Sequence, residues 1–263
     1  MKKKMFRTLL SYEIRNTFRN KWIFGYLVFF FILTELFYQF SPDSSKVFIS
    51  LMNIMLISIP LVSIIYGTQF IYNSREFIQV LLSQPIDRTR IFFSSYFTSL
   101  TAVCGSFVIG SGLPLIIHEA DKQIGFALLL IASGAMLSAA YLSVAYLISY
   151  KFNDKAKGIM VSLTVWFTFS LLYDGLLMFA LFALRDFPLE YPAMFLSILN
   201  PNDLTRMLLI LNLDISAIMG FTGAIYKDFF GTATGLIISF SVLGIWIIIP
   251  LTIALRIFKK KDF

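Results

Sequence analysis

The sequence has few of the residues that most often carry catalysis or metal binding. It contains one cysteine, Cys104, and one histidine, His118, among 263 residues. A lone cysteine excludes a disulfide within the chain and a cysteine cluster around a metal. Charge is also scarce, at 14% of the residues, compared with about 25% in a typical soluble domain. The composition therefore argues against a soluble globular protein.

Common nucleotide-binding and catalytic motifs are absent as well. The sequence has no GxxxxGK[ST] phosphate loop, so the chain does not bind ATP in that way. It also has no HExxH or GxSxG motif. His118 ends an apolar run beside Glu119, where an ordinary interfacial histidine is the simpler interpretation than a ligand. The ten methionines are scattered among leucines and phenylalanines, as packing residues are. We expect no metal, cofactor or nucleic acid on this chain.

What the sequence does contain is long apolar runs. Hydrophobic residues make up 58% of the chain, and the mean hydropathy is +0.79. Six runs reach the roughly 20 residues that a helix needs to cross a bilayer. They cover residues 22–40, 47–72, 91–117, 124–150, 159–184 and 233–257. The sequence therefore predicts an all-α, polytopic membrane protein with six transmembrane helices in one domain, residues 1–263.

The distribution of basic residues predicts the orientation. Of the 22 lysines and arginines, 17 lie in the N-terminal segment, in the loops 73–90 and 151–158, and at the C-terminal end. The other side has five, namely Lys46, Lys122, Arg185, Arg206 and Lys227. Because cytoplasmic segments carry the excess of Lys and Arg, we expect both termini in the cytoplasm. Residues 185–232 then form a long external loop.

Residues 1–21 are basic, and apolar side chains recur among them at helical spacing. This pattern predicts an amphipathic helix that lies in the headgroup layer. A flexible basic tail is the alternative. The run that follows is too long for a signal peptide, and no small-residue cleavage site comes after it.

The polar interruption at 73–90 has an apolar centre, which a simple linker does not need. Phe77, Val80 and Leu81 fit one face of a short helix, and Pro85 favours its end. We predict a cytoplasmic helix at the membrane surface that offers this apolar ridge to another protein.

The external loop contains a second helix signal. Asn200-Pro201-Asn202-Asp203 is typical of a turn that leads into a helix N-cap. Apolar residues then follow at i, i+3, i+4 and i+7. We predict a short amphipathic helix on the outer membrane surface. Its docking residues for an external partner would be Asn200, Pro201, Asp203 and Arg206.

Two carboxylates lie inside predicted spans. Asp174, next to Tyr173, lies well within the fifth span, and Glu35 lies in the outer half of the first. A charge near the bilayer centre costs about 2.5–3.5 kcal/mol on insertion scales. Both residues are candidates for a polar pathway or a dimer centre. The alternative is a structural hydrogen bond between helices, which we favour for Glu35.

The six spans and the helix at 73–90 resemble an ABC-2 type transporter permease. The loop matches the family's pattern at Glu76, at Leu81-Leu82-Ser83-Gln84-Pro85 and at Arg88, but lacks its Gly-Thr. The resemblance implies a homodimer in the bacterial cytoplasmic (inner) membrane, without enzymatic activity of its own. It also implies a separate ATPase subunit, which carries ATP and Mg²⁺ and is seated on this coupling helix. The coupling residues would be Glu76, Phe77, Val80, Leu81, Leu82, Gln84, Pro85 and Arg88.

A narrower resemblance is to the permeases of nitrous oxide reductase maturation. It rests on Leu172-Tyr173-Asp174 and on Asn200-Pro201-Asn202-Asp203-Leu204-Thr205-Arg206. It implies a NosF-like ATPase, a NosD-like periplasmic partner, and a sulfur or copper species as cargo. The alternatives are export of lipid, polysaccharide or drug, a membrane scaffold without transport, and an intramembrane enzyme. For an enzyme, only Glu35 and Asp174 supply polar groups at membrane depth.

Overall fold

The computed structural model describes residues 21–84, 86–119, 123–183, 190–213 and 233–260. Every regular element in these ranges is helical. The helices are α2 (Lys21–Phe40), α3 (Ser44–Asn73), α4 (Arg75–Leu82), α5 (Arg88–Glu119), α6 (Ile124–Lys151), α7 (Lys155–Phe167), α8 (Tyr173–Ala183), α9 (Glu190–Leu199), α10 (Pro201–Asn212) and α12 (Ala233–Lys260). A π-helical segment, η1 (Thr168–Leu172), joins α7 to α8.

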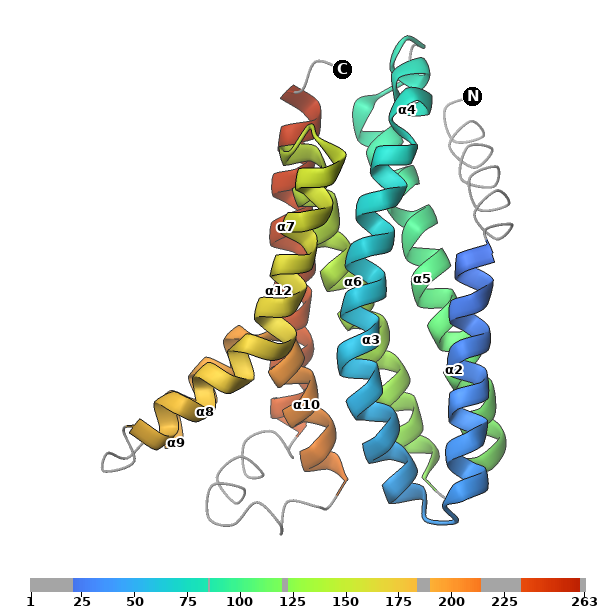
Figure 1. Ribbon diagram of the computed structural model, residues 1–263, viewed down its shortest axis with the longest axis vertical. Coiled ribbons are helices and arrows are strands. Elements are labelled where there is room, and N and C mark those ends of the chain that lie inside the picture. Colours follow the sequence, from blue (N-terminus) through green and yellow to red (C-terminus); the bar gives the residue numbers. More distant parts are fainter. Residues whose placement is uncertain (1–20, 85, 120–122, 184–189, 214–232, 261–263) are drawn as a thin grey trace.

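Six helices in the described ranges are long and apolar enough to cross a membrane, which confirms the predicted all-α, six-span class. The third of these, α5, starts at Arg88 and ends at Glu119, so the spans extend a few residues beyond the predicted limits. The fifth span departs most from the prediction. It starts at Lys155, and the π-helical turn at its middle redirects the chain, so that α8 leaves the bundle at an angle (Figure 1). Single-turn π segments are a known cause of such bends.

Small residues let the long helices approach closely. A Cβ atom added to Gly110 of α5 would lie 2.6 Å from the carbonyl oxygen of Leu27 in α2. A Cβ added to Gly67 of α3 would lie 2.6 Å from a methyl carbon of Leu142 in α6. Such contacts leave no room for a side chain, and membrane helices use small residues at their crossings for this reason.

Some hydroxyl groups on neighbouring helices hydrogen-bond to one another. Tyr96 and Ser143 are 2.9 Å apart, and Ser99 and Tyr146 are 2.8 Å apart, both pairs joining α5 to α6. Thr68 of α3 likewise lies 2.8 Å from the hydroxyl of Ser162 in α7. Interhelical hydrogen bonds of this kind fix the register of neighbours within an apolar medium.

The helices define two ends of the bundle. The short helix α4, the turn between α6 and α7, and the last turn of α12 gather at one end, called here the α4 end (Figure 1). The turn between α2 and α3 lies at the opposite end. The predicted amphipathic helix over residues 1–21 falls, except for Lys21, outside the described residues.

Candidate functional site

The short helix α4 shows which of the predicted coupling residues are accessible. Phe77 and Val80 are 38% and 59% exposed, and Glu76 is exposed beside them. Leu81 is only 6% exposed and packs with Ile78 into the core. The predicted ridge of Phe77, Val80 and Leu81 is therefore wrong in one member. Leu81 anchors α4 to its own bundle, while Phe77 and Val80 face outward.

The remaining predicted coupling residues follow this exposed pair in the sequence. Gln84 is exposed and Leu82 is half-buried, whereas Pro85 lies outside the described residues. Arg88, which begins α5, donates a hydrogen bond of 3.0 Å to the carbonyl oxygen of Lys259 in α12. At the α4 end, Phe77 and Val80 are thus exposed on a helix whose buried side chains, Ile78 and Leu81, pack against the bundle.

Sequence analysis did not single out Arg75, the first residue of α4. Its guanidinium in fact reaches the carbonyl oxygens at the end of α6, including those of Ser149 and Phe152. The sequence offered no signal for this contact, because the partners are backbone atoms more than 70 positions away. This contact joins two loops that sequence analysis treated separately.

A second polar site lies where the start of α8, just after η1, meets α10. Asp174 and Arg206 form an ion pair, and their side chains are 31% and 33% exposed. Asp203, one helical turn before Arg206, lies 3.6 Å from the same guanidinium nitrogen and is buried. One arginine therefore stands between two carboxylates. Asp174 and Arg206 are 32 positions apart in the sequence, and the fold brings them together.

Two asparagines at the start of α10 complete this polar cluster. The Asn200 side chain accepts a hydrogen bond from the backbone N–H of Asn202, as an N-cap residue does. Its amide also donates to the carbonyl oxygen of Phe169 in η1 at 2.9 Å. Asn202 donates to Ser170 at 2.8 Å and to the carbonyl oxygen of Leu56 at 3.3 Å. The asparagines thus satisfy backbone groups that the π turn and α3 present.

These contacts correct the predicted position of α10. The expected N-cap is present, but Asn200, Asn202 and Asp203 are at most 5% exposed. Leu56 lies 12 residues into α3, about 18 Å from its start at 1.5 Å per residue. The helix α10 therefore begins deep in the bundle and runs toward the opposite end, as Figure 1 shows. It does not lie on the outer surface, and its first residues cannot dock an external partner in this conformation.

Glu35 belongs to a separate contact between α2 and α5. Its carboxylate lies 3.2 Å from Nε2 of His118. Tyr38 stacks on the His118 ring with centroids 4.3 Å apart and donates a 2.9 Å hydrogen bond to Glu119. This arrangement agrees with the structural interpretation that we favoured for Glu35. Tyr173 is likewise structural in its contacts, since its hydroxyl donates to the carbonyl oxygen of Leu196 in α9.

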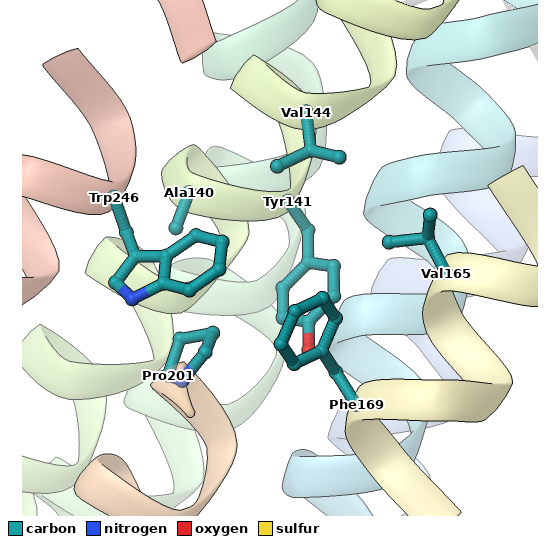
Figure 2. A pocket seen from close by; sticks show the side chains of 7 residues that line it. All are labelled: Ala140, Tyr141, Val144, Val165, Phe169, Pro201 and Trp246. Atoms are coloured by element: carbon teal, nitrogen blue, oxygen red, sulfur yellow. The ribbon is translucent and has the colours of Figure 1, made fainter. Parts of the chain in front are cut away.

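A small pocket lies beside the polar cluster, where α6, α7, η1, α10 and α12 converge (Figure 2). Its lining is largely apolar, from Ala140, Tyr141, Val144, Val165, Phe169, Pro201 and Trp246. Figure 2 shows the Trp246 indole next to Pro201, and the Trp246 and Phe169 rings meet edge to face with centroids 5.3 Å apart. No group of three His, Cys, Asp or Glu side chains that could hold a metal occurs within the described ranges.

Comparison with known proteins gives a family and two relatives. The sequence profile of the family described as "ABC-2 family transporter protein" matches residues 7–263. The chain is 23% identical over 273 residues to "Probable ABC transporter permease protein NosY" of Pseudomonas aeruginosa, covering 97% of this chain and 98% of that protein. A protein of the same name from Stutzerimonas stutzeri is 24% identical over 283 residues, covering 95% and 96% of the two chains.

Proposed function

We propose that this chain, which belongs to the ABC-2 family of transporter proteins, is the membrane-spanning permease of a transporter powered by a separate ATPase. One observation carries the proposal. An eight-residue helix at one end of six candidate spans holds Phe77 and Val80 outward while Ile78 and Leu81 fix it to the bundle. Outward apolar side chains on a firmly seated helix suit a docking surface. The ATPase would bind there, on the cytoplasmic side.

The exposed area sets the size of the effect. Full burial of a large apolar side chain contributes about 1.5–3 kcal/mol, so covering the exposed parts of Phe77 and Val80 contributes about 2 kcal/mol in total. That corresponds to about a 30-fold change in affinity. Exposed charges such as Glu76 would set orientation and association rate more than affinity.

The test is co-purification with a NosF-like ATPase in detergent. The double variant Phe77→Asp/Val80→Asp should lose the ATPase while keeping the size-exclusion profile of the folded permease. Gln79→Asp is the control for added charge, because it places one of the two negative charges on the same exposed helix without removing apolar area. If the double variant retains the ATPase at wild-type stoichiometry, α4 is not the docking surface.

We also propose that the permease acts as a homodimer. The fifth and sixth spans bury 6% and 17% of their apolar stretches, whereas α3, α5 and α6 bury half or more. The Asp174–Arg206 pair lies on this less covered side and remains one-third exposed. Charges facing lipid are costly, which favours a second copy as the cover. The mass of the purified protein tests this, with Phe179→Lys on α8 expected to give monomers. Dissociation by Phe24→Lys instead would move the interface to α2.

For the cargo, we propose a sulfur or copper species for assembly of the copper centre of nitrous oxide reductase, with a NosD-like periplasmic partner. The full-length similarity to two proteins named NosY supports this assignment. The polar cluster is not suited to hold the copper itself, since Cu(I) selects sulfur ligands over carboxylates and amides. Export of lipid, polysaccharide or drug is the alternative.

Replacement of a NosY permease by this chain distinguishes the two cargo assignments. Restored assembly of the reductase copper centre, followed by its absorbance, supports the maturation role. A complex that binds its ATPase but leaves the reductase without that centre supports export of another substrate.

A further inference from the structure

The first residue of α4 reaches across to the end of another span. The Arg75 guanidinium donates hydrogen bonds to the carbonyl oxygens of Ser149 at 3.1 Å, of Phe152 at 2.9 Å and of Asn153. These carbonyls belong to the last turn of α6 and the turn after it, where helical partners run out. A cation there also complements the negative end of the helix dipole. Arg75 therefore closes the end of α6.

Tyr72, the penultimate residue of α3, reinforces the same junction. Its hydroxyl donates to the carbonyl oxygen of Phe152 at 2.9 Å, and its ring lies 4.2 Å beneath the Arg75 guanidinium. The Tyr72 side chain also lies close to Gly158 of α7, where an added Cβ atom would be 2.0 Å from the tyrosine hydroxyl oxygen. Arginine suits this position because its planar fork can stack and donate at once, which a lysine cannot do.

Two further hydrogen bonds extend the junction. Lys155, the first residue of α7, donates to the side-chain oxygen of Asn73 at 2.9 Å. Arg88, just after α4, donates to the carbonyl oxygen of Lys259 in α12. The turn between α6 and α7 and the end of α12 are therefore both tied to the loop that carries α4.

We propose that Arg75 is a positioning residue that makes α4 and the α6–α7 turn move as one body. This inference rests on the proposed function, because it describes how a displacement of α4 by the ATPase is distributed. Without the junction, a displacement would pass along the chain only to α3 and α5. With it, the displacement also reaches α6, which packs against α3, α5 and α12, and α7, which leads to the π turn.

Distance measurement between spin labels tests this directly. The labels go on Gln79→Cys in α4 and Lys157→Cys in α7, both exposed, with Cys104 replaced by serine. In the otherwise wild-type complex with its ATPase, we expect one narrow distance between the two labels of the same chain, unchanged between the complex without nucleotide and the complex with trapped ATP. Arg75→Gln and Arg75→Lys should both lose this single distance. Arg90→Gln is the matched control, since Arg90 pairs only with nearby Asp87 among the contacts described for its side chain, and it should keep the distance.

Two results would overturn the inference. One is a narrow, unchanged distance in Arg75→Gln, and the other is a wild-type distance that differs between the two nucleotide states. Co-purification of the ATPase is scored in the same samples, so failure of the docking proposal is distinguishable. If the ATPase does not bind, the nucleotide-free permease alone still reports whether Arg75→Gln frees the two labels from each other.

Discussion

Removal of Arg206 should destabilise the permease far more than removal of its closest partner, Asp174. The cluster holds one cation between two carboxylates, Asp174 in direct contact and Asp203 at 3.6 Å. Arg206→Gln leaves both carboxylates close together without a cation. Asp174→Asn leaves Arg206 paired with Asp203, and the new amide oxygen still accepts a hydrogen bond.

The expected magnitudes follow from this asymmetry. Loss of one partner from a buried pair costs about 3–5 kcal/mol, and the one-third exposure of the pair places Arg206→Gln near the lower value, at about 3 kcal/mol. For a chain of this size that lowers the midpoint of thermal unfolding by about 6–12 °C. Asp174→Asn should lower the free energy of unfolding by less than about 1 kcal/mol, because Arg206 and Asp203 remain as a pair with no net charge.

Thermal unfolding in detergent, followed by tryptophan fluorescence, measures both variants. The double variant Asp174→Asn/Arg206→Gln should recover part of the loss, since only one carboxylate then remains unpaired. Arg90→Gln provides a surface control with an expected shift near zero, because Arg90 pairs with exposed Asp87. Equal shifts for Arg206→Gln and Asp174→Asn, or a larger shift for the latter, would refute the proposed role of Asp203.

The other predictions concern the bundle and its orientation. Leu81→Asp should lower thermal stability, because it places a charge in the core beneath α4; unchanged unfolding would contradict that burial. Gly110→Ala should cost about 1–3 kcal/mol, since its Cβ would collide with the Leu27 carbonyl oxygen at 2.6 Å, and a wild-type midpoint would show that α2 and α5 are not in close contact. A cysteine at Gln79 should react with impermeant reagents only from the cytoplasm, and one at Asp43 only from outside; the reverse pattern would invert the predicted topology.

Several features of this protein are determined by sequence alone. Six apolar runs interrupted by polar segments leave helices as the spanning element, because backbone groups in lipid must be satisfied within the segment. The N-cap at Asn200 was also predictable from sequence, since capping depends on the capping residue and on the backbone two or three positions later.

Tertiary structure decided which way the short helices face. An amphipathic pattern specifies one apolar side but not what covers it, so α4 and α10 have patterns that suit a membrane surface, a partner or their own bundle equally well. In α4 the bundle takes Ile78 and Leu81 and leaves Phe77 and Val80 outside. In α10 it buries the capping end, which sequence analysis had placed on the outer surface.

The polar contacts between distant segments also came only from the fold. Asp174 and Arg206 are 32 positions apart, and each alone resembles an isolated charge in an apolar region. Asp174 meets Arg206 at the first turn of α8, directly after the π-helical segment η1, and no residue pattern predicted that segment. Arg75 binds carbonyl oxygens at the end of α6, and every residue type has such an oxygen. A contact with backbone atoms does not depend on the type of the residue that accepts the hydrogen bond. Only the packing of the helices could therefore reveal that Arg75 contacts the end of α6.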